Sequence, residues 1–134
     1  MNGFENEEFL MSTRDGRNMK HCRREKFTNC FGVDFFIPIG SITDGGSTPK
    51  LAWSLGLTPF GEEWREYCLH DSAYKGTLEY ADGTKCMLTR QQCDELLMDS
   101  MVACGIDKVR REIIYDAVRV GGKSAFAEDR AAIK

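Results

Sequence analysis

The chain changes its pattern once, at about residue 40, and this change constrains the fold more than any other feature. Residues 19–39 are rich in aromatic and β-branched side chains, with Gly32 marking a turn and Pro38 limiting the last strand. Residues 47–122 instead carry helix-capping signals and glycine stops. An α+β fold is therefore expected, in which a small antiparallel sheet from residues 1–40 packs on three to four helices.

The central helix is expected between Glu62 and about Lys75, where Gly76 can end it. A shorter helix is predicted before it, from Pro49 to Leu55, because proline suits the first helical position.

Two further helices are predicted after the central one. Thr89 and Gln92 have the spacing of a capping box, in which each residue bonds the backbone of the other. Asp107 is expected to cap the next helix, which ends at Gly121–Gly122. Residues 123–134 are expected to form a tail that is amphipathic at most, with a frayed helix as the alternative.

At 134 residues the chain is predicted to be a single domain, large enough to bury one core. No internal repeat or linker divides it. Its hydrophobic share of 42% is ordinary for a soluble protein, and a net charge of -3 gives no reason to expect nucleic acid as a partner.

The first eight residues are acidic and lack the basic and apolar regions of a signal peptide. No apolar run approaches the roughly 20 residues that span a bilayer, so no transmembrane segment is expected. Residence in a cytosol predicts that the six cysteines are free thiols. Cys68, Cys93 and Cys104 are expected to face the core.

One of only two histidines lies in the stretch Tyr67–Tyr74. His70 and Tyr74 are four residues apart, so they share a face of the central helix. Asp71 falls in a largely aromatic stripe, where a buried carboxylate needs a hydrogen-bond donor, a cation or solvent to compensate it. The other histidine, His21, is expected to be a surface residue of a strand.

These residues suggest acid–base chemistry. A neutral histidine can take a proton from water if a carboxylate holds its second ring nitrogen. Asp94, on the flank of the next helix, is the candidate for holding His70, with Tyr74 steadying it by a hydrogen bond. The alternative is that the same polar groups form a buried structural network.

A metal site is a second hypothesis. Asp71 is free in this arrangement to bind a hard cation together with the glycine loop that contains Asp44, Gly45 and Gly46. Calcium prefers such oxygen ligands and would polarise a carbonyl group. The alternative is a plain strand–loop–helix connection in which Asp44 forms an Asx-turn.

Five segments together resemble a family of small phage and prophage proteins of unknown function: Thr43–Pro49, Trp53, His70–Tyr74, Asp94 and Tyr115–Gly122. The shared signature is T-D-G-x-S-x-P, a nearby tryptophan, H-D-x-x-Y, a helical aspartate and an apolar helix that ends in glycine. This resemblance implies a phage or prophage origin, with residence in the host cytoplasm or the virion, and implies no activity.

The His-Asp-x-x-Tyr motif, followed by an aspartate on the next helix, is also similar to the active site of phospholipase A2. That resemblance implies that His70 is the base and Asp71 a calcium ligand, with Tyr74 and Asp94 in support. The calcium loop of the secreted enzymes is not reproduced by Ser41–Thr48, and their disulfide pattern is absent.

Two functions follow as hypotheses. The first is a calcium-dependent ester hydrolase, acting on lipid or another ester, that a phage uses against the host envelope. The second is a non-catalytic phage protein, either a minor virion component or an accessory factor that binds a host protein.

Overall fold

The computed structural model describes residues 3–4, 10–12, 19–21, 24–43 and 64–133. The strands are β1 (Gly3–Phe4), β2 (Leu10–Ser12), β3 (Met19–His21), β4 (Glu25–Thr28), β5 (Asp34–Ile37) and β6 (Ile42–Thr43). The helices are α2 (Trp64–Lys75), α3 (Arg90–Ala103), α4 (Lys108–Gly121) and α5 (Lys123–Ala131). The α+β class predicted from the sequence is confirmed.

The strands divide between two antiparallel sheets of three strands each. One has the order β1-β4-β5 and the other the order β2-β3-β6. In the first sheet Phe27 lies opposite Phe35, and both are buried. Gly32 adopts a φ of +79° in the turn between β4 and β5, as a glycine at that position permits. The expected single sheet is thus two sheets, because β3 pairs with β2 and β6 rather than with β4.

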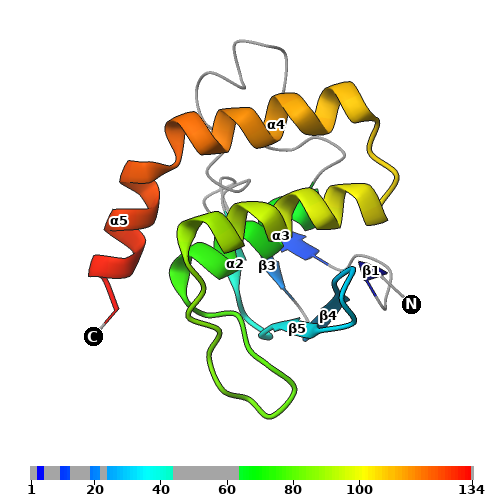
Figure 1. Cartoon of the computed structure of the whole chain (residues 1–134). Helices are drawn as coiled ribbons and strands as arrows, with labels where there is room; N and C mark the ends of the chain where they lie inside the picture. The colour runs from blue at the N-terminus through cyan, green and yellow to red at the C-terminus, as the bar shows by residue number, and fades with distance from the viewer. Residues whose placement is uncertain (1–2, 5–9, 13–18, 22–23, 44–63, 134) are drawn as a thin grey trace.

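The helices α2 and α3 form a layer between the β1-β4-β5 sheet and α4 (Figure 1). A core cluster fills the space between this sheet and the helix pair, and its buried residues are Phe27, Phe35, Ile37, Cys68, Leu69, Ala73, Tyr74, Leu78, Cys86, Cys93 and Leu96. A second cluster joins α2, α3 and α4 through Tyr67, Leu97, Met101, Ile114, Ala117 and Val118. The interface of these three helices therefore excludes water from whatever polar side chains it contains.

Local capping chemistry explains where the helices begin and end. The predicted capping box is present at α3, where the Thr89 side chain accepts from the backbone N–H of Gln92 and the Gln92 side chain accepts from that of Thr89. Asp107 caps α4 through the backbone N–H of Arg110. Gly76 follows α2 with a φ of +71°, which favours glycine.

The predicted tail forms a helix, α5, which lies beside the end of α2 (Figure 1). Arg130 explains its position, because its guanidinium donates to the carbonyl oxygens of Ala73, Tyr74 and Leu88 at 3.1, 2.9 and 2.6 Å. The first two carbonyls belong to the last turn of α2, beyond which the helix supplies no further N–H at i+4. The carbonyl of Ala73 also accepts from the backbone N–H of Gly76 at 3.2 Å.

Cys68 and Cys93 are buried as expected, but Cys104 is exposed, so its predicted core position is wrong. Cys104 lies at the C-cap of α3, where the helix ends before the apolar stripe can continue. The described cysteines are free thiols. The predicted helix Pro49–Leu55 and the side chain of His21 lie outside the described residues.

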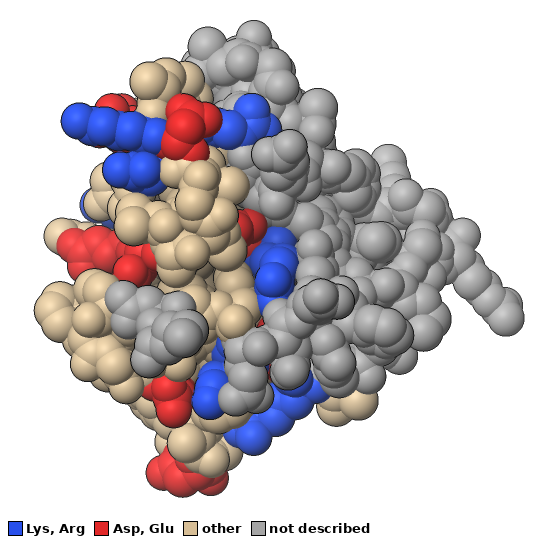
Figure 2. Space-filling model, turned by 90° about the vertical axis from the view of Figure 1, so that its right-hand side faces the viewer, with Lys and Arg blue, Asp and Glu red and all other residues tan. Residues whose placement is uncertain are grey.

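Acidic and basic side chains are interspersed on the described part of the face drawn in Figure 2. Among the described helices, none combines the length and the apolar character that crossing a bilayer requires.

Candidate active site

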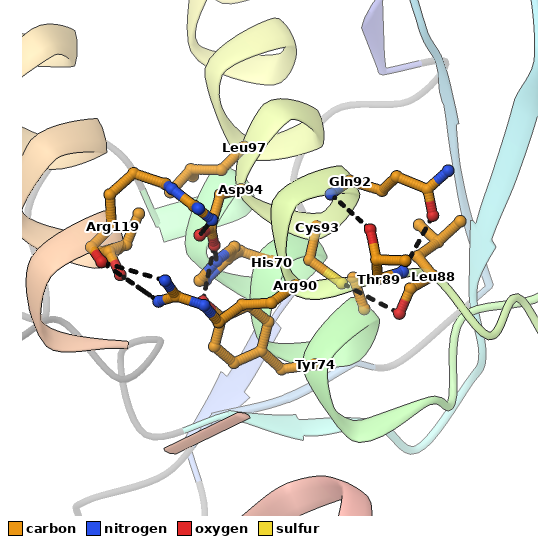
Figure 3. A network of polar contacts seen from close by, with 12 residues as sticks. His70, Tyr74, Leu88, Thr89, Arg90, Gln92, Cys93, Asp94, Leu97 and Arg119 are labelled. Atoms are coloured by element: carbon orange, nitrogen blue, oxygen red, sulfur yellow. Dashed lines mark hydrogen bonds and ion pairs between the residues drawn. The ribbon is translucent and has the colours of Figure 1, made fainter. Parts of the chain in front are cut away.

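The two helices of the middle layer bring His70 and Asp94 together, although 24 positions separate them in the chain (Figure 3). Nε2 of His70 on α2 lies 2.7 Å from Oδ1 of Asp94 on α3. His70 exposes 1% of its surface and Asp94 none. The contact is therefore a buried, charge-assisted hydrogen bond, which is shorter and stronger than a neutral one.

Tyr74 and Arg119 complete the surroundings of Asp94. The hydroxyl of Tyr74, one turn after His70 on α2, donates to Oδ1 of Asp94 at 2.6 Å. Nη1 of Arg119, near the end of α4, donates to Oδ2 at 2.7 Å. Three helices thus converge on one carboxylate, and both of its oxygens accept hydrogen bonds.

These donors determine the charge state of the carboxylate. Burial by itself raises the pKa of Asp94, but the hydrogen bonds from His70, Tyr74 and Arg119 outweigh it and hold the pKa below its ordinary value. Burial and the neighbouring Asp94 raise the pKa of Tyr74, so its hydroxyl keeps its proton. The hydrogen bond to Asp94 likewise raises the pKa of Arg119.

The protonation of the histidine follows from that of the aspartate. An ionised carboxylate only accepts hydrogen bonds, so Nε2 of His70 must carry the hydrogen that points at Asp94. In a neutral ring the second nitrogen, Nδ1, then holds a lone pair. The arrangement can therefore present Nδ1 of His70 as a base while Asp94 holds the ring in place.

Further contacts hold the residues around Asp94 in place. Arg90, in the first turn of α3, donates to the carbonyl oxygens of Val118 and Arg119 at 3.2 to 3.3 Å, which holds the end of α4 against α3. The ring of Tyr74 packs at 4.2 Å between centroids on His70 and edge-on against Phe126 of α5 at 5.2 Å. Tyr74 is therefore held by both of its neighbours as well as by Asp94.

Gly122 is the position where this packing is closest. A Cβ at Gly122 would lie 2.5 Å from the carbonyl oxygen of Val118 and 2.6 Å from Oη of Tyr74. Only glycine fits there without displacing the tyrosine hydroxyl or the helix backbone.

Sequence reasoning brought together His70, Tyr74 and Asp94 but missed Arg119, Arg90 and Gly122. Arg119 could have been found from charge, because a buried aspartate requires a cation and Arg119 lies on the apolar closing helix. No sequence signal indicated the contact of Gly122 with Tyr74, which depends on how α4 meets α5.

The predicted metal ligands are only partly described. Oδ2 of Asp71 lies 2.9 Å from Nζ of Lys75, so a lysine ammonium provides the cation that its burial requires. Asp44, Gly45 and Gly46 lie outside the described residues. Within the described part of the chain no three acidic, histidine or cysteine side chains form a group that could hold a metal ion. The described residues therefore do not fit calcium by themselves.

Comparison with known proteins shows which family the chain belongs to. Residues 22–118 match the family model described as "Protein of unknown function (DUF1353)", which covers more than half of the chain. The chain belongs to the DUF1353 family. The matched range includes His70, Tyr74 and Asp94, and Arg119 follows its last residue. No curated protein and no solved structure gives a significant match.

Proposed function

We propose that this DUF1353 protein is an ester hydrolase in which His70 activates the attacking water. The observation that supports it is the buried contact of 2.7 Å between Nε2 of His70 and Oδ1 of Asp94. Tyr74 holds the same oxygen at 2.6 Å. This is the set of contacts that the resemblance to phospholipase A2 implied for a histidine base and its support.

The chemistry assigned to the site uses Nδ1 of His70. Nδ1 takes a proton from water while the water oxygen attacks the ester carbonyl carbon. Collapse of the tetrahedral intermediate breaks the bond to the alcohol oxygen, which receives the proton from the imidazolium. The products are a carboxylic acid and an alcohol. Asp94 stabilises the imidazolium that forms in between, and Arg119 keeps the carboxylate oriented.

The substrate is proposed to be a lipid or another ester of a host envelope, and the protein to act from the host cytoplasm or the virion. The lipid or ester substrate is supported by the resemblance to phospholipase A2, and the host location by the motif resemblance to phage and prophage proteins. Calcium dependence is a separate proposal, since Asp71 is paired with Lys75. Loss of hydrolysis on chelation tests it.

Substitution of each histidine in turn tests the proposal. The wild type, His70→Gln and the control His21→Ala would be assayed on a p-nitrophenyl ester and on phospholipid vesicles. We expect His70→Gln to lose hydrolysis by about 100-fold or more, because general acid–base catalysis contributes factors of that size. His21→Ala should retain it. Equal hydrolysis by His70→Gln, with its folding verified by denaturation, would overturn the proposal.

A second candidate is a non-catalytic phage protein, a minor virion component or a host-binding factor, in which the network serves folding. The observation that favours it is burial, because His70, Tyr74 and Asp94 expose 1%, 1% and 0% of their surfaces. Catalysis requires water to reach the ring, so the side chains around His70 must move during turnover.

Diethylpyrocarbonate, which modifies accessible imidazoles, separates the two candidates. In the His21→Ala variant His70 is the only imidazole, so its N-carbethoxylation is followed through its characteristic absorbance change. The hydrolase proposal predicts labelling of the native protein and inactivation at the same rate. Labelling only after unfolding would support the structural role instead.

A further inference from the structure

The turn between β4 and β5 holds an aromatic side chain out into solvent. Phe31 exposes 86% of its surface. Oδ1 of Asn29 accepts from the backbone N–H of Phe31 and of Val33, both at 2.9 Å. The backbone of Asn29 also bonds Val33 and Gly32, at 3.0 Å each. The turn is thus fixed by four hydrogen bonds, and the exposure of Phe31 is a property of an ordered structure.

The turn is tied to α3 and borders a groove. The backbone N–H of Cys30 donates to Oδ2 of Asp99 at 2.8 Å. Between the turn and α3 lies a groove of about 730 Å³. It is lined by Asn29, Cys30, Phe31, Phe35, Leu88, Gln92, Glu95, Leu96, Met98, Asp99 and Val102. Asp94 is not among these residues, and neither are His70, Tyr74 and Arg119, so the groove is separate from the candidate active site.

The groove is long enough for a short helix and is lined by apolar side chains. Gln92, Leu96, Asp99 and Val102 recur every three or four positions, so the groove follows α3 over about 15 Å at 1.5 Å per residue. Val102 exposes 52% of its surface in addition to the exposed Phe31. An ordered aromatic side chain beside an apolar groove is typical of a protein-binding surface.

The charges of the groove indicate which sign of charge its partner carries. Among the described residues, the lining of the groove contains two carboxylates, Glu95 and Asp99, and no Lys or Arg. A partner with basic groups along an apolar face complements this surface, whereas an acidic partner is repelled. We propose that the groove between the β4–β5 turn and α3 binds a basic amphipathic helix of a partner protein, with its apolar face against Phe31, Leu96 and Val102.

Two synthetic helical peptides of about fifteen residues test the charge requirement. They share one leucine face, and their polar faces carry lysine in one peptide and glutamate in the other. Binding to the full chain would be followed by fluorescence anisotropy, and the contact surface by ¹H–¹⁵N chemical-shift mapping. We expect the lysine peptide to bind at least about tenfold more tightly and to shift amides of residues 29–33 and of α3. Equal binding of the two peptides, or no binding of either, contradicts the proposal.

Variants of the groove test the location. Phe31→Ala removes an exposed ring without touching the backbone bonds of the turn, and we expect it to weaken binding of the lysine peptide about tenfold. Glu95→Gln should weaken it less and reduce its salt dependence. Val120→Ala is the matched control, because Val120 on α4 is 76% exposed and lies outside the groove. Unchanged affinity in Phe31→Ala overturns the proposal. The proposal is also overturned if the wild-type chain self-associates and Phe31→Ala abolishes this self-association. The groove would then bind a second copy of the chain instead of a basic helix.

Discussion

At the scale of residues, one fully buried carboxylate receives donors from two neighbouring helices. Asp94 accepts hydrogen bonds from His70, Tyr74 and Arg119, each from a side chain on a neighbouring helix. A buried carboxylate that lost these partners would be strongly destabilising, whereas the fully bonded group holds three helices in one arrangement.

The pH dependence of stability tests the charge state of Asp94. Its folded pKa lies below its ordinary value of 3.8, so folding favours the ionised form. Its contribution to the free energy of unfolding is therefore complete well above pH 3.8, and it is lost as pH falls through the folded pKa. Urea unfolding of the wild type and Asp94→Asn over a range of pH should show a difference that is large at neutral pH and shrinks in acid. A difference that grows on acidification would contradict this assignment.

Gly122→Ala tests the close contact beneath Tyr74. The added Cβ would meet a backbone oxygen and a phenol oxygen, at 2.5 and 2.6 Å, and the backbone cannot move aside cheaply. We expect a loss of about 1–3 kcal/mol in the free energy of unfolding, as for other overpacked sites. Gly121→Ala, at an exposed position in α4, is the control and should be neutral or slightly stabilising. Equal free energies of unfolding for the two variants would contradict the close packing of Gly122 against Val118 and Tyr74.

At the scale of elements, arginine side chains add hydrogen bonds between helix ends that the apolar clusters also bring into contact. Arg90 donates to carbonyl oxygens at the end of α4, and Arg130 on α5 donates to carbonyl oxygens at the end of α2. The planar guanidinium explains the choice, because it offers several donors in a fixed geometry. The position of α5 therefore depends on Arg130 and on the contact of Phe126 with Tyr74.

Substitution of Arg130 tests this dependence. Arg130→Lys keeps the charge but replaces the forked donors with a single ammonium, which cannot reach the same three carbonyl oxygens at once. We expect faster amide hydrogen exchange throughout α5, by about tenfold or more, while α3 keeps its protection. Glu128→Ala, at an exposed position of the same helix, should leave exchange unchanged. Unaltered exchange in Arg130→Lys would mean that Phe126 alone holds the helix.

At the scale of the whole molecule, the features predictable from the sequence are those that depend on short-range chemistry. The α+β class follows from the change of pattern near residue 40, and the caps at Thr89 and Asp107 follow from side chains that bond backbone three residues away. The meeting of His70 and Asp94 was predictable because helical periodicity places both toward a shared interface. The division into two sheets depends on tertiary contacts, and no local pattern encodes it. The need of Asp94 for a cation pointed to an arginine such as Arg119, but which cation reaches the carboxylate depends on how α4 packs.

Calcium binding would involve several parts of the chain at once, and it needs its own test. Lys75 now holds Asp71, so an ion at this carboxylate must compete with an ammonium 2.9 Å away. If calcium binds, it raises the melting temperature of the native protein. Lys75→Ala should then bind calcium more tightly, and Asp71→Asn should abolish the rise. No calcium-dependent shift in either the wild type or Lys75→Ala would exclude Asp71 as a ligand.

The central claim is that an ionised Asp94 fixes His70 with its hydrogen on Nε2, which leaves Nδ1 as the base. Long-range ¹H–¹⁵N NMR of the His21→Ala variant reports the two nitrogens of His70 directly, since no other histidine is then present. We expect the neutral ring to be protonated at Nε2 and unprotonated at Nδ1. A ring protonated at Nδ1 instead would contradict it.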